Sequence, residues 1–123
     1  MRELVVLRVA RHTRSSYEWV QHAKLSQRYG VSAAEVEAIS SGDDSGWAPS
    51  DALLLEATDQ LLTNYQIDDD TWDQLASVMD ERTLLELIFV VGTYTALAMV
   101  FNGIDIELDP DLDPAGAPSI TSE

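Results

Sequence analysis

The chain has 123 residues, and its 7 Lys and Arg residues stand against 22 Asp and Glu residues, which gives a net charge of −15. That charge repels nucleic-acid phosphates and anionic membrane surfaces, so we expect neither as a partner. The chain has no cysteine, which excludes disulfides, thiolate metal sites and thiol nucleophiles. Its length and its 46% hydrophobic content indicate one globular domain with an ordinary core.

The charge is unevenly distributed along the chain. Residues 1–28 hold six basic and two acidic side chains, whereas residues 29–123 hold one basic side chain, Arg82, and twenty acidic ones. Two interpretations follow. The arginines of the first segment are ordinary surface charges, or they form a locally positive site that attracts an anionic small molecule despite the overall charge.

Apolar residues at helical spacing predict a first helix over residues 2–11, with two adjacent apolar faces. One face carries Leu4, Leu7 and Ala10, and the other carries Val5, Val6 and Val9. The same criterion predicts further helices at about 17–29, 32–39, 50–62, 70–79 and 83–101. The capping signals that mark their ends are Ser15 or Ser16, Gly30, the Ser32–Glu35 capping box, Ser50 or Asp51, Asp69 or Asp70, a break at 80–82, and Asn102-Gly103.

The segment 83–101 is long and apolar enough to suggest a membrane span. Glu86 lies inside it, Gly92 and two threonines lower its hydrophobicity, and no positive flank marks a cytoplasmic side. We therefore expect a helix buried at the centre of a bundle or between subunits. The predicted fold is all-α with about six helices, of which the last three form a local antiparallel bundle.

Two further expectations concern the ends of the chain. Residues 1–104 form the predicted helical domain, and residues 105–123 form an acidic, proline-containing tail. We expect this tail to be extended or disordered and free to pack across a neighbouring chain. The one candidate for a strand is a short stretch at 104–108. The sequence begins without the apolar core of a secretory signal, and together with the absent cysteines this favours a cytoplasmic location.

Glu18 and His22 are the main candidates for chemistry. They lie four residues apart on one predicted helix and therefore share a face. A carboxylate beside an imidazole orients the ring for general acid–base catalysis. The alternative is a pair that only stabilises the helix. A metal site would need Glu3 or His12 as a third ligand and lacks any metal-binding motif, so we expect no metal. Ser15 lacks a nucleophile elbow and is better explained as a cap.

Several segments together resemble the carboxymuconolactone decarboxylase and alkylhydroperoxidase-D-like family. They are Glu3–Ala10, Tyr17-Glu18-Trp19-x-x-His22, Asp51–Leu54, Trp72 in its helix, and Leu85–Tyr94. Their order and spacing carry the resemblance, which covers roughly residues 2–108. It implies a helical fold that assembles into trimers or hexamers, with sites near subunit interfaces. Members of the family usually carry more chain before the segment that begins here at Met1, and that chain helps to cover the site. Two expectations follow: the pocket lacks this cover, or a partner subunit supplies it.

The family's redox branch has a glutamate, a Cys-x-x-Cys pair and a histidine. Laid on this chain, the glutamate falls on Glu3, the two cysteines on Ser15 and Glu18, and the histidine on His22. Peroxidase chemistry needs a thiolate and a resolving thiol, so the resemblance implies a member without that activity.

The decarboxylase branch needs no thiol and no cofactor. The resemblance therefore implies a lyase or isomerase acting on a small anionic lactone or organic acid, with His22 as general acid–base and Glu18 and Glu3 orienting it. The expected substrate-binding residues are Arg8, Arg11, Arg14, Ser15 and Trp19. Two alternatives stay open: a non-catalytic, ligand-binding oligomeric relative, and a biosynthetic hydrolase or cyclase that uses the same pair.

Overall fold

The computed structural model describes residues 1–120, and over these residues it is all-helical, as predicted. Its elements are α1 (Arg2–Thr13), α2 (Ser16–Leu25), the 3₁₀ turn η1 (Ser26–Tyr29), α3 (Ala33–Ser41), α4 (Pro49–Asn64), α5 (Asp69–Ala76), α6 (Glu81–Ile104) and the 3₁₀ turn η2 (Pro114–Gly116). No strand occurs between residues 1 and 120, so the possible strand at 104–108 was a wrong prediction. The last three residues of the predicted tail lie outside the described part.

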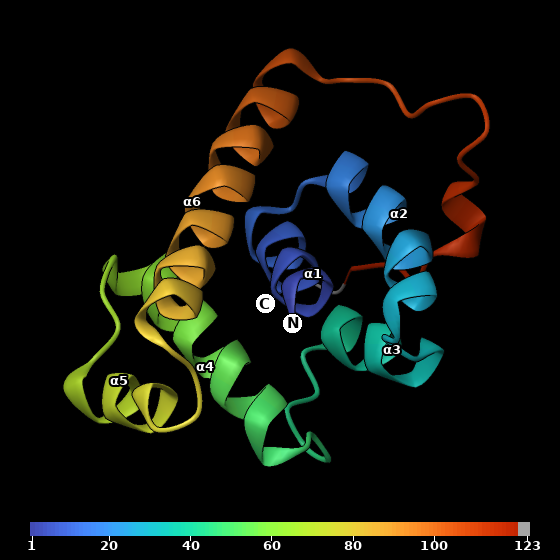
Figure 1. Ribbon diagram of the computed structural model, residues 1–123. Helices are drawn as coiled ribbons and strands as arrows, with labels where there is room; N and C mark the ends of the chain where they lie inside the picture. The colour runs from blue at the N-terminus through green and yellow to red at the C-terminus, as the bar shows by residue number, and fades with distance from the viewer. Residues whose placement is uncertain (121–123) are drawn as a thin grey trace.

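Helix α1 is the centre of the molecule, with α2 and α3 on one side and α4, α5 and α6 on the other (Figure 1). Every residue from Leu4 to Arg11 is buried. The two apolar faces predicted for α1 belong to two different hydrophobic clusters. Leu4, Leu7 and Ala10 pack with residues of α2, α3 and α4, while Val5 and Val9 pack with residues of α4, α5 and α6.

The first connection is tighter than the predicted turn at 12–16, because α1 runs on to Thr13. Only Arg14 and Ser15 separate α1 from α2. Arg14 adopts a left-handed conformation, and Ser15 is the N-cap of α2, as predicted. Gly30 ends η1 with a φ of 95°, a backbone conformation that glycine adopts without strain. The short connection at Arg14 and Ser15 reverses the chain and places α2 directly against α1.

The predicted capping box at the start of α3 is confirmed. The Ser32 side chain accepts a hydrogen bond from the Glu35 amide, and the Glu35 carboxylate accepts one from the Ser32 amide. The start of α4 differs from the prediction. Its N-cap is Ala48 rather than Ser50 or Asp51, because Pro49 has a φ suited to the first helical turn and needs no hydrogen-bond acceptor there.

The helices α5 and α6 also begin one or more residues earlier than predicted. Asp68, the first of three consecutive aspartates, caps α5 by accepting from the Thr71 amide, so the expected caps Asp69 and Asp70 lie inside the helix. Asp80 caps α6 in the same way, which places most of the predicted break at 80–82 in the helix. As predicted, α4, α5 and α6 contact one another.

Helix α6 is far more exposed than the sequence predicted. It continues past the expected stop at Asn102-Gly103 to Ile104, yet only Leu84, Leu87, Val91 and Ala98 are buried. In the described residues it is the one helix whose length and mean hydropathy of 2.0 would allow it to cross a membrane. A single such helix is weak evidence for a membrane protein and is compatible with a soluble one. It differs from an ordinary core helix, however, because only 22% of its apolar window is buried.

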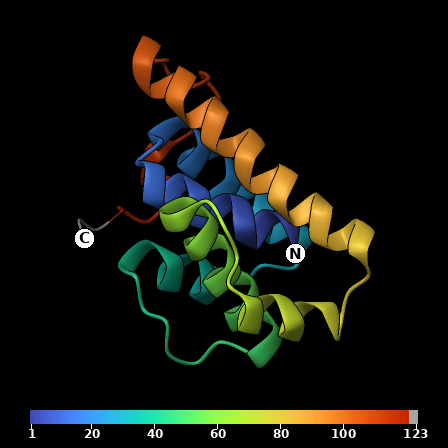
Figure 2. The same cartoon turned by 90° about the vertical axis from the view of Figure 1, so that its left-hand side faces the viewer.

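The segment after α6 folds back over its own chain instead of extending away. Figure 2 shows it returning past α2 on the side away from α4 and α5. Leu108, Leu112, Ala117 and Ile120 pack against the cluster that contains Trp19. The Trp19 indole Nε1–H donates to the Pro118 carbonyl over 2.7 Å. Up to residue 120 the segment has no regular secondary structure apart from η2, as expected of an extended tail, and its apolar residues pack against α2 of the same chain.

Candidate active site

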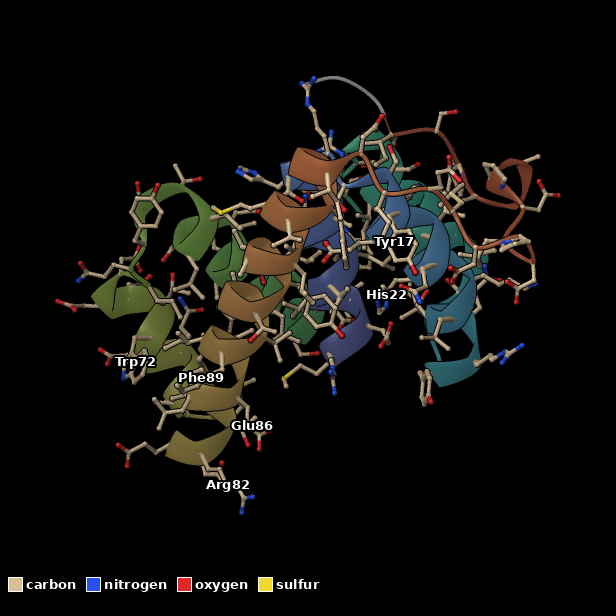
Figure 3. All side chains as sticks on the ribbon, turned by 90° about the horizontal axis from the view of Figure 1, so that it is seen from above. Tyr17, His22, Trp72, Arg82, Glu86 and Phe89 are labelled. Carbon is tan, nitrogen blue, oxygen red and sulfur yellow. The ribbon has the colours of Figure 1, made fainter. Side chains whose placement is uncertain are left out.

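The two acid–base groups that the structure brings together are Glu3 and His22. Glu3 lies in the first turn of α1, and His22 lies near the end of α2, on the side facing α1 (Figure 3). His22 Nδ1 and Glu3 Oε2 are 2.9 Å apart, and both side chains are largely buried. A carboxylate at this distance fixes the orientation of the ring and leaves Nε2 as the free nitrogen. This is the geometry of an oriented acid–base histidine.

A cavity of about 530 Å³ opens beside this pair. Its wall includes Arg2 and Tyr94 in addition to Glu3 and His22, and Leu25, Tyr29 and Val31 supply an apolar side. The Arg2 guanidinium donates to the Tyr94 hydroxyl over 3.2 Å, and the Tyr94 ring meets the His22 ring edge-on with centroids 5.4 Å apart. The cavity thus combines an acid–base pair, a cation and a phenol, which suits a small organic anion.

The contact predicted between Glu18 and His22 is not formed in the described part of the chain. Glu18 is 1% exposed, and neither of its carboxylate oxygens has a hydrogen-bond partner. Burial raises the pKa of Glu18 to about 7. Spacing placed the two residues on one helix face, but α1 supplies Glu3 to the histidine instead. Glu18 is therefore a buried carboxyl one helical turn before His22 in α2, and it does not line the cavity.

Two of the predicted anion-binding arginines lie in a different cavity. Arg8 and Arg11 are buried and line a polar space of about 470 Å³ between α1, α3 and α4, apart from the His22 cavity. Arg8 contacts Asp44 at 2.7 Å and Asp59 at 3.5 Å, and Arg11 Nε donates to the Ser40 carbonyl at the end of α3. These contacts hold the loop after α3 and the end of α3 against α1, which explains why two arginines occur in a buried helix.

The remaining predicted site residues have structural positions. Arg14 is exposed and forms the left-handed end of α1. Ser15 is fully buried as the cap of α2, and Trp19 is buried under the returning C-terminal segment. None of the three lines the His22 cavity within residues 1–120. Their expected role in substrate binding has no support in this arrangement.

Two residues of the site were missed by sequence reasoning. Arg2 was grouped with the other arginines of the first segment, although its position beside Glu3 places it at the end of α1 nearest His22. Tyr94 lies in the apolar segment 83–101, which was expected to be buried as a whole at the centre of a bundle or between subunits. No periodicity distinguishes it there, since its role depends on the packing of α6 against α1.

Residues 1–120 contain no group of three or more His, Asp or Glu side chains placed to hold a metal ion. Comparisons with protein-family models, with curated proteins and with solved structures give no match to this chain.

Proposed function

We propose that this protein is an acid–base enzyme of the decarboxylase type, a lyase or isomerase acting on a small anionic lactone or organic acid without a thiol. The observation that carries the proposal is the 2.9 Å contact between Glu3 and His22 at the wall of a cavity that also holds Arg2. The resemblance of residues 2–108 to the carboxymuconolactone decarboxylase family supports the same chemistry.

Each group has a role in this proposal. Arg2 pairs with the substrate carboxylate that is retained, and the Tyr94 hydroxyl donates to the lactone oxygen where charge accumulates. The bond between the ring carbon and the departing carboxylate breaks, CO₂ leaves, and the electron pair stays on the carbon skeleton as an enolate. His22 Nε2–H then protonates the carbon, and solvent returns the proton to His22. Glu3 holds the ring in this orientation through its contact with Nδ1.

The test is turnover of a panel of lactone carboxylates, followed by CO₂ release. His22→Gln is expected to lower kcat by about 100-fold or more, because it removes the proton donor. Glu3→Gln should lower kcat less, and Arg2→Gln should mainly raise KM. His12→Gln is the matched control: His12 is the only other histidine, is exposed and lies outside the cavity.

Two results would contradict the proposal. One is turnover by the parent protein that survives His22→Gln unchanged. The other is binding of the panel compounds, measured by calorimetry, with no turnover of any of them. The second result would identify a ligand-binding protein that uses the same cavity.

A further inference from the structure

One exposed face of α6 has the spacing of a helix-packing seam. Its six members follow one another at intervals of four, three, four, three and four residues, which is the heptad pattern of paired helices. They are Leu85, Phe89, Gly92, Ala96, Met99 and Gly103, and every one is exposed. None is charged, although the chain as a whole carries −15. We call this stripe the α6 seam; Figure 3 shows Phe89 and the neighbouring Arg82 and Glu86 on the first half of the helix.

Gly92 has no explanation within a single chain. It lies at the middle of a 24-residue helix, where glycine is among the least favourable residues. A Cβ added there would meet nothing within 4 Å, and the same holds for Gly103. Neither glycine is needed for a turn or for packing inside this molecule. A glycine on an exposed helix face is explained if another backbone approaches it closely.

We propose that the α6 seam packs against the α6 seam of a second copy, antiparallel and about a two-fold axis near Tyr94. In that register the residue numbers of facing positions sum to 188. Gly92 then faces Ala96 of the second copy, so the two helices approach most closely at the centre. Leu85 faces Gly103 of the second copy, and Phe89 faces Met99, so each large side chain at the ends meets a small or flexible one.

The space beside the seam and the charges at its ends fit the same arrangement. An apolar groove of about 320 Å³ between α4 and α6 borders Gly92, Ala96 and Met99, and a second hollow of about 420 Å³ borders Phe89 on the other flank. Arg82, whose side chain is 88% exposed and lies 3.6 Å from Glu86, falls just past the point where Ile104 ends the helix of the second copy. Its charge thus faces the negative end of that helix, where Asp105 and Glu107 follow in the chain.

This contact relates two copies by a two-fold axis. It is present in a dimer, and in a hexamer that combines two-fold and three-fold axes, but not in a cyclic trimer. The inference does not depend on the proposed activity, because the six seam residues include none of Glu3, His22, Arg2 and Tyr94.

The first experiment measures the mass of the full chain by light scattering and sedimentation over a range of concentrations. We expect an even-numbered oligomer. Gly92→Leu should weaken association by about tenfold or more, because the added side chain separates the two backbones. The same substitution should raise the melting temperature of the dissociated chain, because leucine favours helix. Ala34→Leu makes a comparable change on the exposed face of α3 and should leave association unchanged.

The second experiment tests the relative orientation of the two α6 helices. Because the chain has no native cysteine, only introduced cysteines can cross-link. In the antiparallel register, two copies of residue 85 are about 27 Å apart, whereas residue 85 faces residue 103. Leu85→Cys and Gly103→Cys proteins should therefore form a disulfide when mixed and oxidised, and neither should cross-link alone. Arg82→Glu should weaken association, and adding Glu107→Lys should restore it.

Three results would overturn the inference. They are a parent chain that stays monomeric at every concentration, association that Gly92→Leu does not weaken, and self-cross-linking of Leu85→Cys alone, which indicates parallel helices. A monomer that partitions into zwitterionic lipid vesicles through α6 would identify a membrane as the occupant of the seam instead.

Discussion

At the scale of single residues, the most unusual group is the carboxyl of Glu18. It is almost fully buried and makes no hydrogen bond in the described structure, so its charged form is disfavoured. Its pKa of about 7 lies above the ordinary value of 4.5. In the folded chain Glu18 therefore holds its proton at pH values where the unfolded chain has already lost it. This difference links the stability of the fold to pH.

The sign of that linkage gives a prediction. Glu18 contributes stability that is fully present below pH 4.5 and is lost as the pH rises through about 7. Glu18→Gln removes the titration and should make the fold more stable than the parent at pH 8, by up to roughly 3 kcal/mol. Urea unfolding of both proteins at pH 5 and pH 8 measures this difference in the free energy of unfolding.

Glu37→Gln, an exposed change on α3, is the control and should leave the pH dependence of the parent intact. A Glu18→Gln protein with the same pH dependence as the parent would show that another group accounts for it.

At the scale of secondary-structure elements, short-range signals determine where helices begin. The capping box of α3 needs only two residues three positions apart, Ser32 and Glu35, and both of its hydrogen bonds form. The caps of α4 and α5 were placed one to three residues too late. At α4 the apolar Ala48 takes the N-cap position because Pro49 begins the helix, and at α5 three adjacent aspartates compete for that position. Cap identity is thus predictable where one candidate stands alone.

Ser32→Ala should lower the free energy of unfolding by about 1 kcal/mol, because the Glu35 amide loses its acceptor at the start of α3. Chemical denaturation of the purified chain measures the change. Ser41→Ala, at the other end of α3, removes only an exposed hydroxyl bond to the Ala38 carbonyl and serves as the control. Equal losses in the two variants would contradict the capping role.

At the scale of the whole molecule, the segment after α6 closes over α2. The Tyr17 hydroxyl lies 3.2 Å from the Asp109 carboxylate, and the Tyr17 ring packs on Phe101 at 5.0 Å between centroids. Together with the Trp19–Pro118 hydrogen bond, these contacts join α2, the end of α6 and the returning segment. The segment covers a large aromatic side chain that would otherwise face water.

Trp19→Phe keeps an aromatic ring but removes the donor to the Pro118 carbonyl. We expect the free energy of opening the returning segment to fall by about 1 kcal/mol. The Leu112 and Ala117 amides should then exchange with solvent correspondingly faster. Amide hydrogen exchange measures this directly. Trp72→Phe, in the cluster on the other side of α1, should leave those two amides unchanged. Unaltered exchange after Trp19→Phe would mean that apolar packing alone holds the segment.

The sequence by itself determined the all-helical class, the two-faced first helix and the starts of α2 and α3, because these follow from interactions between residues three or four positions apart. It also singled out His22 and, through the resemblance, Glu3 as candidate site residues, and the structure brings these two side chains within 2.9 Å of each other. Only the tertiary structure decided which carboxylate meets His22, because that depends on how α1 packs against α2. Likewise, only packing decided that short α1, rather than long and apolar α6, occupies the centre. Hydrophobicity predicts that a face will be covered, but it does not say whether the same chain or another one covers it.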